Sequence, residues 1–138
     1  MSAAHVALVQ GQLDAVGAPY VKALGLQLLS HEGGQVRIRL PVTPALVHGG
    51  GVVCGQAMLA AADTAMVVAL SAALGGFKPM TTVQLNTSFL RPVPADVPEL
   101  ILTCTVLRRG KSLAFGSIDI TTPDGKLAAQ ATTTYAFL

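Results

Sequence analysis

The chain has 138 residues, a length that suits one compact domain, and we expect residues 1–138 to form it with residues 1–19 as an N-terminal helical extension. Hydrophobic residues make up 51% and charged residues only 12%, which leaves too little polar surface for an ordinary monomer and indicates a homo-oligomer. The net charge of +2 is too small for a general nucleic-acid binder, and the two cysteines form no disulfide framework, which favours a cytoplasmic setting.

The N-terminal third of the chain predicts two short helices followed by a β-hairpin. Its first residues have neither a basic start nor a continuous apolar core, so we expect no signal peptide. Further on, apolar and polar residues alternate, Glu32 to Gly34 supply turn residues, and Pro41 and Pro44 close the second strand. The expected elements are helices near residues 4–14 and 19–24 and strands at 27–30 and 36–40.

A long apolar helix is expected in the middle of the chain. A loop with three consecutive glycines, Gly49–Gly51, precedes it. From about Cys54 to Leu74 the sequence is rich in Ala, Leu and Met, contains no Pro and is followed by Gly75. The segment is apolar nearly all round, but Asp63 at its middle would be costly in a bilayer. We therefore expect a helix enclosed by protein and no membrane partner.

Four β segments complete the chain, and turn residues connect the last three. Their ranges are about 81–90, 98–108, 112–121 and 126–137. In the first of them, Val83, Leu85, Thr87 and Phe89 are expected on one face. The pattern has no βαβ alternation, and a helix apolar on all sides needs cover around most of its circumference. We therefore predict an α+β protein in which a curved antiparallel sheet of about six strands wraps one long helix.

Two residues of the expected long helix could carry chemistry. Asp63 interrupts the most apolar run of the chain, and a desolvated carboxylate there indicates an active site, unless the side chain faces a solvated seam or caps a backbone group. The amide of Gly55 would lie in the first helical turn without an intrahelical partner, where it could stabilise an oxyanion. The alternative for Gly55 is a glycine needed only for close packing.

Three segments together resemble one family of enzymes. They read HGGGVVCGQ at 48–56 with Leu59 and ADTA at 62–65, TTVQLNTSFLRPV at 81–93, and LRRGKSLAFGSIDI at 107–120. These segments are similar to PaaI-type (phenylacetic acid degradation-related) hotdog-fold acyl-CoA thioesterases over roughly residues 20–138. The resemblance implies a hotdog fold and hydrolysis of a small, medium or aryl acyl-CoA to free acid and CoA. It implies no metal and no cofactor other than the CoA of the substrate.

The resemblance also implies site residues. Asp63 falls on the family's catalytic carboxylate, and Gly55 on the residue whose amide polarises the thioester carbonyl. Thr82 falls on a hydroxyl-bearing position that helps to hold the nucleophile, and His48 on a position near the thioester. Three positions depart from the family pattern. His48 stands where Asn or Gln is usual, Cys54 where His is usual, and Gln56 where a second Gly is usual.

The spacing of Gly55 and Asp63 bears on how a site could form. The two residues are eight positions apart on the expected helix, which at ~1.5 Å per residue separates them by roughly 12 Å. One thioester cannot touch both residues of a single subunit, so one of them would come from a partner chain. This agrees with what the resemblance implies, a site at the interface of a dimer or of a dimer of dimers.

The main basic cluster is expected near strand ends and in one turn. It consists of Arg91, Arg108, Arg109 and Lys111. Guanidinium groups suit the phosphates of CoA, and plain solvation of exposed turns is the alternative explanation.

Three other activities remain open at this point. Cys54 at a helix start, with His48 as its base, could act as a nucleophile. His48 and Asp63 also supply the residue types of a hotdog dehydratase or hydratase, although the sequence lacks the His-Phe-Pro-Gly style of loop that those enzymes carry. The departures at Cys54 and Gln56 fit a non-catalytic acyl-CoA-binding module as well.

Overall fold

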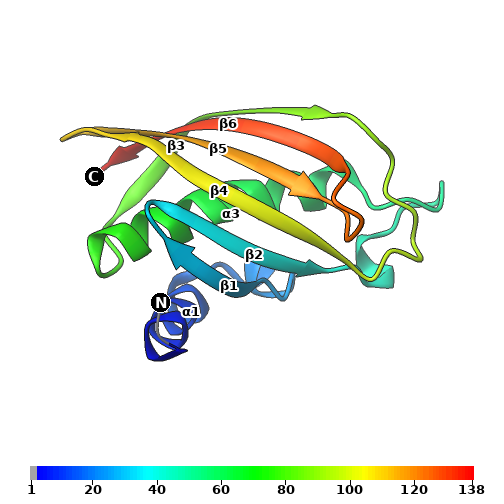
Figure 1. The fold of residues 1–138 in the computed structure, drawn as a ribbon, viewed down its shortest axis with the longest axis horizontal. Coiled ribbons are helices and arrows are strands. Elements are labelled where there is room, and N and C mark those ends of the chain that lie inside the picture. Colours follow the sequence, from blue (N-terminus) through cyan, green and yellow to red (C-terminus); the bar gives the residue numbers. More distant parts are fainter. Residues whose placement is uncertain (1–2) are drawn as a thin grey trace.

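The computed structural model describes residues 3–138, and it confirms the predicted fold class (Figure 1). One curved antiparallel sheet of six strands, in the order β1-β2-β4-β5-β6-β3, wraps a single long helix, α3. The helices are α1 (Ala3–Val16), α2 (Pro19–Lys22) and α3 (Gly55–Leu74), with a short 3-10 helix at Pro44–Leu46. The strands are β1 (Gln27–Glu32), β2 (Gln35–Pro41), β3 (Met80–Phe89), β4 (Glu99–Arg109), β5 (Leu113–Thr121) and β6 (Leu127–Phe137).

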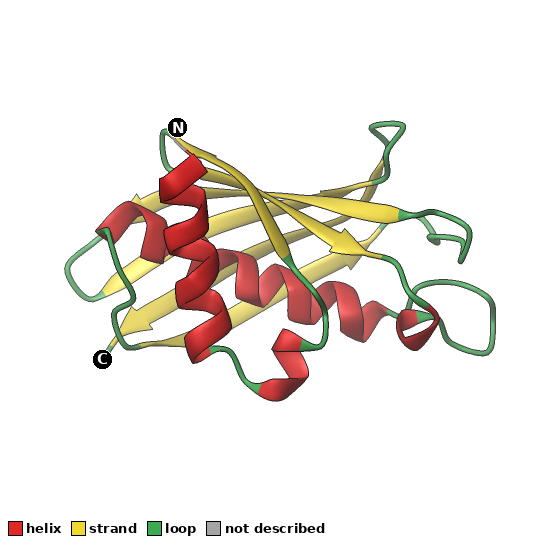
Figure 2. Cartoon of the chain, turned by 90° about the horizontal axis from the view of Figure 1, so that it is seen from below, coloured by secondary structure: helices red, strands yellow, loops and turns green. Residues whose placement is uncertain are grey.

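Helix α3 is the centre of the hydrophobic core. The sheet covers it on one side and α1 crosses it on the same face of the sheet, so that apolar residues around the helix are buried (Figure 2). The helix is long and apolar enough to span a membrane, yet 67% of its most apolar stretch is buried inside the protein. Gly75, in the left-handed region at φ 74°, ends the helix. Burial by the sheet therefore accounts for a helix without a polar face.

Strand β5 approaches α3 closely because of one glycine. A Cβ atom added at Gly116 would lie 2.5 Å from Sδ of Met66, a buried residue of α3, and 3.2 Å from the carbonyl oxygen of Thr105. A larger residue would force the buried Met66 side chain to move. The glycine therefore makes room for Met66 between β5 and the middle of α3.

The edge of the sheet at β1 is covered by α1. The side chain of Gln10 bridges the backbone of this edge, since the N–H of Leu28 donates to its Oε1 at 2.8 Å and its Nε2 donates to the carbonyl of Leu26 at 3.1 Å. Val9 of the same helix is buried in the core. Helix α1, which lies in the expected N-terminal extension, is thus packed against the domain, and its glutamine occupies hydrogen-bonding groups of the edge.

The opposite edge of the sheet, β3, is open and carries a β-bulge. Its register with β6 shifts between Thr82 and Gln84, so Val83 has no partner on β6 and its side chain is 59% exposed. The prediction that Val83 shares a face with Leu85 is therefore wrong. The extra residue instead brings Thr82, three positions before Leu85, onto the face that packs toward α3.

Candidate active site

The turn before α3 presents the first amide of that helix. The N–H of Gly51 donates to the carbonyl of His48 at 2.9 Å, and the N–H of Cys54 donates to the carbonyl of Leu46 at 2.8 Å, which holds the entry to the helix. Cys54 itself is extended, with φ −70° and ψ 146°, so α3 begins at Gly55. A helix has no internal acceptor for this first N–H, and no other residue of the described part of the chain accepts it. The Gly55 amide is therefore available to a ligand.

A small apolar cavity borders Gly55. It has a volume of about 220 Å³ and is lined by Val53, Gly55, Met58, Phe89, Leu90, Arg91 and Pro92. The ring of Phe89 packs so closely on the helix start that a Cβ at Gly55 would lie 3.3 Å from its Cζ atom. The absence of a side chain at Gly55 thus lets the Phe89 ring, from the end of β3, lie beside the free amide. Gly55 therefore fits both expected roles, because it allows close packing and also presents a free N–H.

Asp63, two turns further along α3, is half-buried and accepts hydrogen bonds from two hydroxyl groups. Thr82 Oγ1 donates to its Oδ1 at 2.8 Å, and the Tyr135 hydroxyl lies 2.5 Å from the same oxygen and 2.9 Å from the Asp63 carbonyl oxygen. No described residue donates to Oδ2. The carboxylate is therefore held through one oxygen while the other can act on a bound molecule.

The two hydroxyl donors come from directly opposed positions of the sheet. Thr82 on β3 pairs with Tyr135 on β6, and the bulge at Val83 gives both the same inward orientation. Tyr135 is only 2% exposed. Burial, and then its hydrogen bond to the Asp63 carboxylate, raise the pKa of Tyr135 far above its usual range, so the phenol stays protonated as a donor.

Sequence reasoning predicted the contact of Asp63 with Thr82 but missed Tyr135. The signal that could have revealed it lies in the last strand, where Ala129, Ala131 and Thr133 precede Tyr135 on the inward face. A single large side chain with a polar tip, among small ones on a buried face, needs a hydrogen-bond partner. The half-buried Asp63 is the acceptor that the structure supplies.

His48 and Cys54 do not form a nucleophile–base pair in the structure. Nδ1 of His48 accepts the N–H of Gly50 at 2.8 Å, so a neutral ring carries its proton on Nε2 and offers a donor. Cys54 is a half-buried residue whose thiol makes no hydrogen bond to His48 among the described residues. The arrangement suits His48 as a hydrogen-bond donor at the exposed turn before α3.

Replacement of Cys54 by alanine should therefore leave turnover within about twofold of the original, because the thiol makes no hydrogen bond to His48 or Asp63 among the described residues. Steady-state kinetics with an acyl-CoA ester and a stability measurement by thermal unfolding check this. A loss of turnover in a folded Cys54→Ala protein would favour the cysteine-dependent alternative.

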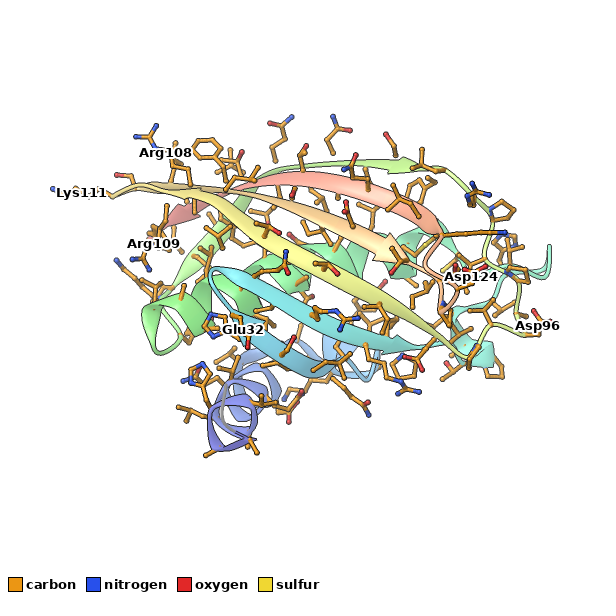
Figure 3. The ribbon with its side chains drawn as sticks, in the orientation of Figure 1. Glu32, Asp96, Arg108, Arg109, Lys111 and Asp124 are labelled. Atoms are coloured by element: carbon orange, nitrogen blue, oxygen red, sulfur yellow. The ribbon has the colours of Figure 1, made fainter. Side chains whose placement is uncertain are left out.

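The basic residues do not form one cluster within a protomer, which corrects the expectation of a single group. Arg108 and Arg109 end β4 and Lys111 lies in the turn that follows, at one end of the sheet (Figure 3). Arg91 follows β3 at the other end, where it borders an open groove of about 610 Å³ with Asp96, Asp124 and Lys126. The four cations thus lie at strand ends and in a turn, as expected, but at opposite ends of the sheet.

No group of three or more His, Cys, Asp or Glu residues with metal-binding geometry occurs in residues 3–138.

The fold defines the class of the protein. A six-stranded antiparallel sheet curled around one long helix is the hotdog fold, and the chain has the PaaI type of this fold, as predicted. A model of the thioesterase superfamily matches residues 50–129. The chain therefore belongs to the thioesterase superfamily and is a thioester hydrolase.

Solved structures share this fold. The conserved protein PA5202 from Pseudomonas aeruginosa is 28% identical, with a TM-score of 0.80, over 91% of this chain and 98% of that one. The PaaI protein of the phenylacetic acid degradation operon of E. coli is 22% identical, with a TM-score of 0.81, over 96% and 95% of the two chains. The thioesterase HI1161 from Haemophilus influenzae is 23% identical, with a TM-score of 0.82, over 95% and 90%. A comparison with curated protein sequences gave no match.

Proposed function

We propose that this protein is a cytoplasmic acyl-CoA thioesterase that releases a small, medium or aryl acyl group as the free acid. Asp63 is the catalytic carboxylate and the Gly55 amide is the oxyanion donor. The observation that carries the proposal is the state of Asp63, a half-buried carboxylate with two hydroxyl donors on one oxygen and the other oxygen free of protein donors. The family supplies the reaction class, thioester hydrolysis.

The two groups meet in a dimer formed at the open edge of the sheet. Thr82, beside Asp63, and Phe89, beside Gly55, lie at opposite ends of β3, roughly 23 Å apart at ~3.3 Å per residue. Antiparallel pairing of β3 with the same strand of a second copy places the Phe89 end of one protomer next to the Thr82 end of the other. One protomer's Gly55 and its partner's Asp63 then border a common cleft. One thioester can contact both there, although the two residues of a single helix are ~12 Å apart.

The same pairing also brings the basic side chains of the two protomers close together. Arg91 of one protomer, at the Phe89 end of β3, comes to the end of the joint sheet where the partner carries Arg108, Arg109 and Lys111. Residues that are separated within a single chain thus lie on one side of the shared cleft. There they would hold the phosphates of CoA, since guanidinium forks match phosphate oxygens.

The reaction follows from these positions. The carbonyl oxygen of the thioester accepts a hydrogen bond from the Gly55 N–H, and the exposed Nε2–H of His48 helps to orient it. Oδ2 of Asp63 takes a proton from water as the water oxygen attacks the carbonyl carbon, or it attacks the carbon itself as a nucleophile. The C–S bond then breaks and the CoA thiolate takes up a proton. In the general-base route the acyl group leaves as the carboxylic acid at this point. In the nucleophilic route it is first bound to Asp63 as an anhydride, which a water molecule hydrolyses to release the acid and restore the carboxylate.

The phosphate contacts can be tested separately from the chemistry. The double variant with Arg108→Gln and Arg109→Gln should raise KM for acyl-CoA about tenfold at low salt while kcat changes less than about twofold, because both side chains contact only the CoA part of the substrate. The effect should shrink as ionic strength rises. Arg37→Gln, an exposed arginine of β2, is the matched control. An unchanged KM in the double variant would show that Arg108 and Arg109 do not contact CoA and serve only to keep the exposed turn solvated.

The proposal as a whole is tested by incubating the purified protein with a panel of fatty-acyl and aryl-acyl CoA esters, phenylacetyl-CoA among them, and measuring free thiol. Release of CoA from at least one ester at a rate well above the spontaneous rate is expected. Dehydration or hydration of a CoA ester without thiol release would identify a lyase instead. Tight binding of CoA esters with no turnover over hours would identify a binding module.

A further inference from the structure

Tyr135 holds Asp63 more firmly than Thr82 does. Its hydroxyl contacts both the carboxylate and the main-chain carbonyl of Asp63, at 2.5 Å and 2.9 Å, so it links the side chain to the helix backbone that carries it. The phenol comes from β6, an interior strand with neighbours on both sides, and is 2% exposed. Thr82 belongs to the open edge strand and lies next to the bulge.

The two donors leave the carboxylate in one defined orientation. Both bind Oδ1, and an oxygen that accepts two hydrogen bonds has reduced capacity to accept a proton from water or to attack a carbonyl carbon. Oδ2 has no described donor. The rotation of the carboxylate is therefore restricted, and Oδ2 is the oxygen that the described residues leave without a donor.

We propose that Tyr135 is the positioning residue of the active site, which fixes Asp63 through Oδ1 so that Oδ2 is the oxygen that acts on the thioester. This inference rests on the proposed function and adds the residue that determines the geometry of its carboxylate. Tyr135 does not touch the reacting atoms. Its effect passes through Asp63, and it therefore acts on turnover more than on substrate affinity.

The test is Tyr135→Phe, which removes one oxygen and keeps the buried ring. We expect kcat to fall about tenfold or more while KM changes less than about twofold, because the carboxylate loses its fixed orientation and the substrate contacts are kept. Tyr20→Phe, at the other tyrosine of the chain, is 62% exposed and serves as the matched control with no change expected. Wild-type kcat in the folded Tyr135→Phe protein, or a fall in kcat matched by an equal rise in KM, would overturn the inference.

A second measurement separates this inference from the proposed reaction. The side-chain carboxyl carbon-13 NMR signal of Asp63, recorded at neutral pH, is assigned by its loss in Asp63→Asn. In folded Tyr135→Phe this signal should change its chemical shift, whether or not any ester is hydrolysed, because Oδ1 loses a hydrogen bond. An unchanged signal would refute the role of Tyr135, whereas a changed signal in a protein that hydrolyses no ester of the panel would refute only the proposed function.

Discussion

Replacing Asp63 by asparagine should lower kcat for acyl-CoA hydrolysis about a thousandfold and leave KM nearly unchanged. Asparagine keeps an oxygen that can accept the hydrogen bonds of Thr82 and Tyr135, so the packing around residue 63 is retained. What is lost is the negative charge that removes a proton from water or attacks the carbonyl carbon. Thiol release under steady-state conditions measures kcat, and binding of a non-hydrolysable CoA analogue measures affinity.

The matched control for this substitution is Asp119→Asn. Asp119 is also half-buried, and it accepts a hydrogen bond from Gln130 at 3.2 Å on a strand away from Asp63. Its replacement removes the same charge without touching the proposed site, so activity should stay close to that of the wild type. Equal activities of the Asp63→Asn protein and the wild type would remove Asp63 from the mechanism.

Replacing Gly55 by proline should lower kcat about a hundredfold, because proline has no N–H to donate to the oxyanion. The helix itself should tolerate the change. Gly55 is the first residue of α3, where proline is well accepted, and the extended backbone of Cys54 suits a residue before proline. Turnover and far-ultraviolet circular dichroism of the purified variant are the measurements.

The Gly55→Ala variant distinguishes the loss of the N–H group from the effect of an added side chain next to Phe89. Gly55→Ala adds a Cβ 3.3 Å from the Phe89 ring, as proline does, but keeps the N–H group. We expect the alanine variant to retain much more activity than the proline variant. If both lose activity equally, Gly55 serves close packing alone.

The same two variants test whether the site is shared between protomers. In mixed dimers of Asp63→Asn and Gly55→Pro chains, one of the two clefts combines an intact Gly55 with an intact Asp63 from the other chain. Random reassociation of equal amounts should then restore about a quarter of the original activity, since about half of the dimers are mixed and each has one complete site. A site formed within one chain would show no recovery on mixing.

Local patterns in the sequence predicted most of the fold. Every helix and strand expected in the chain lies within two residues of its predicted bounds, because apolar periodicity, glycine turns and proline stops act over a few residues. The 3-10 turn at Pro44–Leu46 was not predicted, since a single turn leaves no periodic signal.

What the sequence could not reveal depends on pairing between distant strands. Strict alternation puts Thr82 and Leu85 on opposite faces, and only the register with β6 shows that Val83 is an inserted residue. Tyr135 meets Asp63 across 72 positions of the chain, a contact that no local pattern contains. The separation of Arg91 from Arg108 likewise follows from strand direction in the completed sheet.

The unequal edges of the sheet limit how far copies of the chain can associate. At β1 the side-chain amide of Gln10 uses the hydrogen-bonding groups of Leu26 and Leu28 that an incoming strand would need, whereas β3 carries no such block among the described residues. Each molecule thus has one edge strand, β3, that can pair with a strand of another copy. When two copies pair through β3, both remaining edges of the joint sheet are β1 edges, which are blocked. Association by strand pairing therefore stops at a dimer and does not continue into a fibre.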